Sequence, residues 1–227
     1  MNVQPYLCSR NQGDLRRPLR RAKCPTSFSS LPARAAPPRI RPAPPPLPGW
    51  TPPTRALVAS PRPHSDPAYA SGIYTPSEAR TPRQSEVVGV SDIAVDELFA
   101  ADHIVLATGF INFSISSTLK SWIDHVSRSG KTFAYSANGP KGMVTGKKVY
   151  IVLASGGIYS EGPAAASDFA VPYLKSVLAF NGMTDVEVIR VEGVGMGEDA
   201  AKAALAKAAT QIDEIAAKVG GKVAAAA

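Results

Sequence analysis

Short apolar runs alternate with helical patterns over the second half of the chain, and this alternation constrains the fold more than any other feature. Three runs have the length and β-branched content of strands, at 103–108, 147–155 and 184–193. Between and around them lie helical patterns over 85–101, 116–130, 164–181 and 198–219. Strands that alternate with helices form a parallel sheet with helices on its faces. We therefore expect an α/β protein with a doubly wound parallel sheet, in which strand 103–108 is covered on both faces.

Local signals predict where the helices begin and end. Ser91 is the expected N-cap of the first helical segment, and Ser116 or Ser117 that of the second, which Gly130 should end. Pro172 lies inside the third segment. Because proline donates no N–H and clashes with the preceding turn, it predicts a kink or two separate pieces there.

Residues 1–66 have a different composition from the rest of the chain. They contain 15 of the 21 prolines and 11 Lys and Arg residues, against two acids. The whole chain carries +7, so residues 67–227 carry −2 and the basic pI belongs to the first segment. We expect a mostly disordered leader over 1–66, a folded domain over 67–220 and a flexible tail over 221–227.

The same counts bear on partners and location. A basic footprint for nucleic acid should lie on the folded surface, so binding of nucleic acid, by the leader, is the least favoured alternative. No apolar run approaches the roughly 18–20 residues of a membrane span, and no signal peptide is recognisable. A cytoplasmic protein without membrane contact is expected. An alternative is that the Arg-rich leader is an organelle transit peptide, although its prolines preclude the long amphipathic helix that many such peptides form.

Two loops follow the carboxyl ends of the first two strands, where ligands bind in such sheets. The first contains Phe110, Ile111, Asn112 and Phe113, and the second contains Ala154, Ser155, Gly156 and Gly157. Aromatic walls and backbone N–H donors would suit a planar ring that carries carbonyls. The alternative is ordinary packing of the phenylalanines under the next helix and a tight turn at the glycines.

The chain from about residue 67 to 219 resembles the FMN-dependent NADH azoreductase / NADH:quinone oxidoreductase family, which has a flavodoxin-like fold. The resemblance rests on four stretches: TPRQSEVVGVSD, NFSISSTLKSWIDHVSRSGKTFAYSANGPKGMVTGKKVYIV, SGGIYSEGPAAASDFAVPYL and GMTDVEVIRVEG. It implies FMN as cofactor, NADH as electron donor, a quinone or azo compound as acceptor, and a homodimer. It also implies that Asn112 hydrogen-bonds the flavin ring edge, that Phe113 packs beside it, and that Gly156 and Gly157 donate to its carbonyls.

The chain departs from the family at both loops and upstream of them. The family usually has Met-Tyr-Asn-Phe where this chain has Phe110 to Phe113, and Ser-Arg-Gly-Gly where it has Ala154 to Gly157. The first strand-helix-strand unit, with its serine-rich phosphate loop, is missing or replaced. Its nearest remnant holds Ser60 and Ser65 as weak candidates for phosphate ligands. Without that unit, strand 103–108 would lie at an edge of the sheet. We then expect the chain to be less stable than its relatives and to bind FMN weakly.

Other motifs carry little chemistry. The glycines between 193 and 197 and the TGKK segment at 145–148 lack the spacing of nucleotide-binding loops. His64, His103 and His125 are scattered, and Cys8 and Cys24 have no metal-ligand spacing, so no metal site is expected. No side chain stands out as a catalytic acid, base or nucleophile. We therefore expect an FMN-dependent oxidoreductase, with a non-catalytic flavodoxin-like fragment that cannot hold FMN as the alternative.

Overall fold

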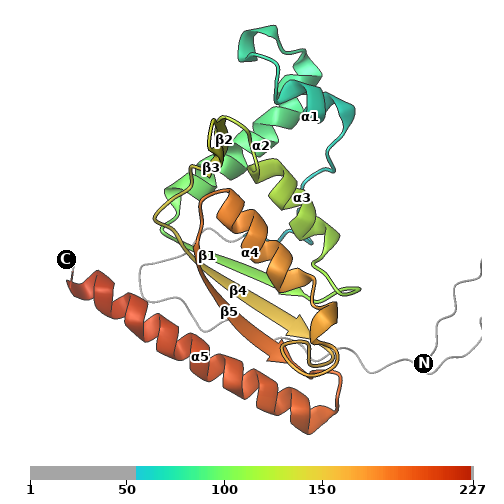
Figure 1. Cartoon of the computed structure of the whole chain (residues 1–227), viewed down its shortest axis with the longest axis vertical. Helices are drawn as coiled ribbons and strands as arrows, with labels where there is room; N and C mark the ends of the chain where they lie inside the picture. The colour runs from blue at the N-terminus through green and yellow to red at the C-terminus, as the bar shows by residue number, and fades with distance from the viewer. Residues whose placement is uncertain (1–54, 226–227) are drawn as a thin grey trace, which may run out of the picture. The chain divides into compact units, whose positions relative to one another are not determined.

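Three parallel strands in the order β1–β4–β5 form the central sheet of the computed structural model, which describes residues 55–225 and side chains to residue 219 (Figure 1). The strands are β1 (His103–Gly109), β4 (Lys148–Ser155) and β5 (Asp185–Glu192). In the register, Gly109 lies opposite Ala154, and Ser155 lies opposite Glu192. The α/β class, the parallel sheet and all three expected strands are confirmed.

Helices cover the two faces of this sheet unequally. They are α1 (Pro67–Gly72), α2 (Pro82–Ala100), α3 (Ser117–Val126), α4 (Ala170–Phe180) and α5 (Glu198–Ala225), with short 3-10 turns at Ser77–Ala79 and Ala165–Ser167. In Figure 1, α3 and α4 lie on one side of the sheet and α5 lies on the other, along β5. An antiparallel hairpin of β2 (Phe133–Ser136) and β3 (Gly139–Gly142) stands apart from the sheet.

The main core lies between the sheet and α2, α3 and α4. Strand β4 supplies its centre with Val149, Ile151 and Leu153, all essentially inaccessible to solvent. Ile104 and Leu106 of β1 face the same core. Burying a side chain of this size contributes about 1.5–3 kcal/mol, so β4 is the best anchored strand.

Strand β1 is buried on one face only, and the prediction that it is covered on both faces is wrong. Its side chains alternate between buried and exposed, and Val105 is 64% exposed. On the face that Val105 shares, α5 packs against Ile189 and Val191 of β5, so this helix leaves β1 bare. The unbroken apolar run could not reveal this, because coverage depends on which other elements reach the strand.

Strand β1 also lies at an edge of the sheet. It pairs with β4 on one side, and no other strand in residues 55–225 pairs with its second side. This is the position expected for 103–108 if the first strand-helix-strand unit is missing or replaced. Edge strands offer unpaired N–H and C=O groups to other chains.

Helix α2 begins nine residues earlier than its expected cap. Thr81 is the N-cap, Pro82 occupies the first turn, and Thr81 and Gln84 form a reciprocal capping box. The prediction of Ser91 as N-cap is wrong. Its hydroxyl is buried in the middle of α2 and donates to the carbonyl of His125 over 2.5 Å.

The ends of α3 and α4 combine confirmed and corrected predictions. Ser116 caps α3 as expected, but the helix ends at Val126, four residues before Gly130, which adopts a φ of 76° in the following turn. Helix α4 begins at Ala170, so Pro172 lies in its first turn, where a missing N–H costs little. The segment does lie in two pieces, the 3-10 turn and α4, but the break comes before Ala170 and Pro172 does not interrupt α4, so the prediction of a break at Pro172 is wrong.

Residues 55–66 pack onto the domain, so the expected boundary at residue 66 lies too late. Leu57 contacts the main core, Arg55 pairs with Glu97, and Ser121 and His125 of α3 contact the carbonyl of Pro63. The expectations for the leader up to residue 54, including Cys8 and Cys24, lie outside the described residues. At the other end α5 continues to Ala225, where a tail from residue 221 was expected, although Gly220 and Gly221 have a low helix propensity.

Candidate functional site

The two predicted loops meet at the carboxyl edge of the sheet. Phe110 donates its backbone N–H to the carbonyl of Ala154 over 2.7 Å, directly beyond the paired ends of β1 and β4. The parallel register places both loops on the same edge because each strand ends where its neighbour ends. The predicted site residues from Phe110 to Phe113 and from Ala154 to Gly157 therefore lie side by side.

Asn112 and Phe113 form a tight two-residue turn. Ile111 and Ser114 exchange backbone hydrogen bonds of 2.9 and 3.0 Å, and the two residues between them have φ angles of 47° and 69°. Positive φ at both central positions is the geometry of a type I′ turn, which Asn tolerates and Phe does not. An L-residue in this region costs roughly 1–2 kcal/mol, and such strain persists mainly at functional sites.

The loop at Gly156 and Gly157 is supported from behind by the loop that follows β5. Gly193, Val194 and Gly195 donate backbone N–H groups to the carbonyls of Gly157, Ser155 and Gly156. Neither Gly156 nor Gly157 donates its own N–H to any acceptor in residues 55–225. The glycine-rich segment after β5 thus holds this loop in place and leaves the N–H groups of Gly156 and Gly157 free. The sequence predicted no role in binding for that segment.

Aromatic side chains line the site between the two loops. The ring of Tyr159 lies 4.3 Å from that of Phe110 and 6.3 Å from that of Phe113, measured between centroids. Phe113 remains 49% exposed, so the cluster has an open apolar side. Tyr159 follows the two glycines in the second loop, and no role was predicted for it. The sequence could not reveal its contact with Phe110, because that contact depends on the conformation of the loop.

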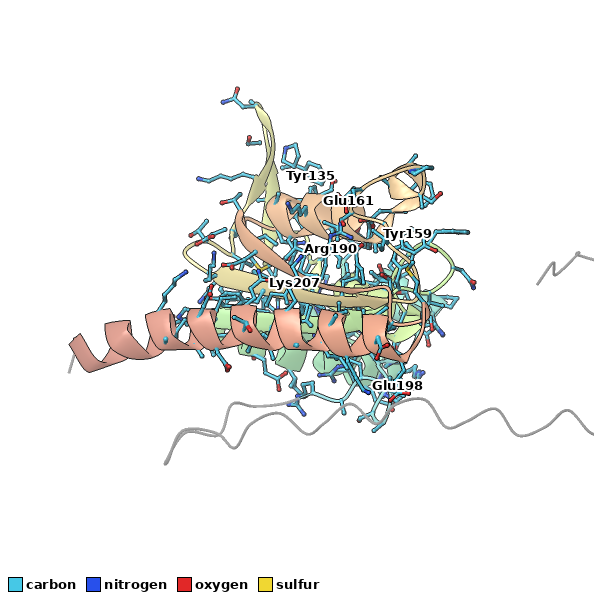
Figure 2. All side chains as sticks on the ribbon, turned by 90° about the horizontal axis from the view of Figure 1, so that it is seen from below. Tyr135, Tyr159, Glu161, Arg190, Glu198 and Lys207 are labelled. Atoms are coloured by element: carbon cyan, nitrogen blue, oxygen red, sulfur yellow. The ribbon has the colours of Figure 1, made fainter. Side chains whose placement is uncertain are left out.

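An open, polar hollow of about 350 Å³ lies next to this site, beside β5. Its lining comes from the second loop, from β5 and from α5, and includes Ser160, Glu161, Arg190, Glu192, Lys207 and Gln211. Figure 2 shows Glu161 and Arg190 on the sheet side of this region and Lys207 on α5. The hollow adjoins the second loop and does not include the turn at Asn112, so we do not assign the ring site to it.

The histidine side chains and possible metal ligands of the described residues lie apart from the two loops or do not form a cluster. No group of three or more His, Cys, Asp or Glu side chains in the described part of the chain could hold a metal ion. His125 is buried under α2, where Nε2 must donate to the Pro63 carbonyl 2.9 Å away. Burial lowers the pKa of His125, although the hydrogen bond to Pro63 acts in the opposite direction.

Ser60 and Ser65 do not form a phosphate site in this structure. Helix α1 has only six residues, and the Asp66 carboxylate already accepts the N–H of Tyr69 over 2.7 Å. A carboxylate at that position repels phosphate. The residues present therefore fit the ring end of FMN, with free N–H donors and an aromatic wall, and residues 55–225 contain no strand-serine loop-helix unit for its phosphate.

Comparisons with known proteins identify the family to which this fold belongs. A family model described as a flavodoxin-like fold matches residues 48–216. The FMN-dependent NADH:quinone oxidoreductase of Mesorhizobium japonicum is 72% identical over 161 residues, which cover 71% of this chain and 77% of that protein. FMN-dependent NADH:quinone oxidoreductase 1 of Rhizobium etli is 56% identical over 162 residues, covering 71% and 79%.

Solved structures lead to the same fold. The crystal structure of azoreductase AzrA has a TM-score of 0.67 and 31% identity, covering 71% of this chain and 79% of that one. An azoreductase from Bacillus anthracis has a TM-score of 0.67 and 30% identity with the same coverage. None of the helices between residues 55 and 225 combines the length and hydrophobicity that a membrane crossing requires.

Proposed function

The chain belongs to the flavodoxin-like family of FMN-dependent NADH:quinone oxidoreductases and azoreductases, and we propose that it passes electrons from NADH to quinones and azo compounds with FMN as its cofactor. The observation that carries this proposal is the contact between the two loops, where Phe110 donates to Ala154 over 2.7 Å. It brings the strained Asn112 turn and two free glycine N–H groups to one edge of the sheet.

Each loop has a defined role toward the flavin ring in this proposal. The side chain of Asn112 hydrogen-bonds the polar edge of the ring, and Phe113 packs beside it. Gly156 and Gly157 direct their N–H groups at the ring carbonyls, as unpaired backbone donors do at anionic or polar ligands. Bound FMN supplies the transfer of electrons, which explains why no acid/base pair stands out among the side chains.

Aromatic contacts determine what else can enter. Phe110, Phe113 and Tyr159 form an apolar wall that excludes water from the ring and accommodates flat substrates. Quinones and azo dyes are flat, and NADH presents a flat nicotinamide. One open aromatic site thus suits donor and acceptor in turn.

Two further assignments follow from the family. We infer a homodimer, as the resemblance implies, and a cytoplasmic protein, as expected from a sequence in which neither a signal peptide nor a membrane span is recognisable. Size-exclusion chromatography with light scattering tests the dimer, and cell fractionation tests the location.

The alternative of a non-catalytic fragment is not favoured, because the 72% identity to an FMN-dependent enzyme extends over 161 residues, 71% of this chain. The test is reconstitution of the purified full chain with FMN, followed by NADH oxidation with a soluble quinone. We expect visible flavin absorption bands and quinone-dependent NADH consumption. A chain that keeps no flavin after the excess FMN is removed by gel filtration, while folded by circular dichroism, would contradict the proposal.

A further inference from the structure

Glu192, at the end of β5, holds the tip of the second loop. Its two carboxylate oxygens accept the backbone N–H of Tyr159 over 2.9 Å and the hydroxyl of Ser160 over 2.5 Å. The side chain is only 13% exposed. Hydrogen bonds to a charged acceptor are about twice as strong as neutral ones, so this contact defines where Tyr159 lies.

Arg190 connects Glu192 to the start of α4. One guanidinium nitrogen, Nη1, lies 3.1 Å from Glu192, and the other, Nη2, lies 2.5 Å from the carboxylate of Asp168. Arg190 and Glu192 are two residues apart on β5, so their side chains share one face of the strand. We refer to these three side chains as the Glu192–Arg190–Asp168 bridge.

Asp168 carries the connection to the first loop. Its Oδ1 accepts the N–H groups of Ala170 and Val171 over 3.0 Å each and so caps α4, while its Oδ2 pairs with Arg190. The residue between, Phe169, donates its N–H to the carbonyl of Phe113 over 3.1 Å. The Asp168 side chain is 6% exposed, so solvent screens these contacts weakly.

We propose that Glu192 and Asp168, joined through Arg190, are positioning residues that fix the separation of the two loops, so that loss of either acid loosens both. A path from Tyr159 to Phe113 runs through the hydrogen bonds of the bridge, then along the backbone from Asp168 to Phe169, and ends in the hydrogen bond from Phe169 to Phe113. The bridge sets the width of the gap that the flavin ring occupies, and this role rests on the proposed function. No member of the bridge belongs to the predicted ring contacts.

Hydrogen exchange of the full-length protein without FMN tests the coupling directly. In Glu192→Ala, exchange at the amide of Tyr159 should accelerate at least about tenfold, because its charge-assisted hydrogen bond is lost. The amides of Phe169, Ile111 and Ser114, which are hydrogen-bonded in the parent, should accelerate about threefold, although Glu192 contacts none of them. Asp168→Asn should produce the reciprocal effect on the amide of Tyr159.

Matched variants exclude trivial explanations. Glu198→Ala makes the same change at an exposed α5 position, where the side chain pairs only with Lys202 and is 82% exposed, and should leave both loops unchanged. If Glu192→Ala unfolds, Glu192→Gln keeps size and one acceptor, and should accelerate exchange in both loops about threefold. Faster exchange confined to the loop that each acid touches would overturn the proposal.

A flavin measurement separates this inference from the proposed function. In FMN titrations, Glu192→Ala and Asp168→Asn should each raise the dissociation constant about tenfold, and the double variant should raise it no further than either alone, since both break one path. A parent protein that binds no FMN contradicts the proposed function and leaves the exchange result intact. If exchange in the two loops is coupled but the two substitutions lower FMN affinity additively, the bridge has only a structural role. That result would overturn its role at the flavin ring.

Discussion

Gly195 donates its backbone N–H to the carbonyl of Gly156 over 2.9 Å, and a Cβ on Gly195 would lie 3.1 Å from that carbonyl oxygen. A Cβ on Gly156 itself would meet nothing within 4 Å. The two glycines thus face each other across one contact, but only one of them borders open space. This asymmetry separates packing from binding experimentally.

We expect Gly156→Ala to leave the free energy of unfolding unchanged and to weaken FMN binding about tenfold, because the new methyl group fills the space beside the ring. Gly195→Ala should instead lower the unfolding free energy by about 1–3 kcal/mol through backbone overlap. Urea denaturation and FMN titration measure the two effects. Equal FMN affinity in Gly156→Ala and the parent would argue against a ring at this position.

The strained backbone at Phe113 predicts a difference between two truncations. Phe113→Gly and Phe113→Ala both remove the ring, but glycine adopts a φ of 69° without steric cost. The free energy of unfolding of Phe113→Gly should therefore be about 1 kcal/mol higher than that of Phe113→Ala. Both should bind FMN more weakly than the parent. If the alanine variant equals the glycine variant in stability, the turn is not held in the left-handed region.

The bare face of β1 predicts self-association. Val105→Lys places a charge on the exposed edge strand, which disfavours pairing with other chains, and should reduce light scattering on mild heating. The matched control is Ile93→Lys, which changes an equally apolar, exposed side chain on α2. Equal protection by both variants would trace the effect to net charge and not to the edge.

His125 predicts a loss of stability on acidification. Burial holds the pKa of His125 below its ordinary value, and neighbouring Arg62 lowers it further, against the hydrogen bond to Pro63. Below about pH 6.5 the unfolded imidazole binds a proton that the folded one refuses, so the unfolding free energy falls; above it the contribution is complete. The parent should lose more stability than His125→Gln between about pH 7 and pH 5 in urea titrations. Identical losses, or an NMR titration of His125 at or above pH 6.5, would refute this.

The sequence predicted the elements whose signals are local. The strands and the Ser116 cap depend on neighbouring residues alone, and the structure confirms them. One local signal was missed: the capping box of Thr81 and Gln84 marks the true start of α2. Ser91 lies inside that helix, where its hydroxyl bonds to His125 of another helix. The prediction that β1 is covered on both faces failed at Val105 because coverage depends on where α5 lies.

The candidate site shows the same division. Its two loops could be predicted because parallel strands end at one edge, and Phe110 and Ala154 meet there. The roles of Tyr159 and Glu192 could not be predicted, because their contact depends on the register between β4 and β5 and on the path of the loop between them. The charged residues among the apolar ones of β5, Arg190 and Glu192 included, were the available signal.

Helix α5 is synthesised after the other described elements, and within residues 55–225 it is the helix that covers Ile189 and Val191 of β5. Both loops and the bridge precede it in the chain, so the nascent domain can assemble its ligand edge while the back of β5 is still uncovered. At about 5–20 residues per second, a ribosome needs some seconds to translate this helix. During that interval the apolar face of β5 is exposed to chaperones. The rate at which α5 is translated therefore affects the yield of folded protein.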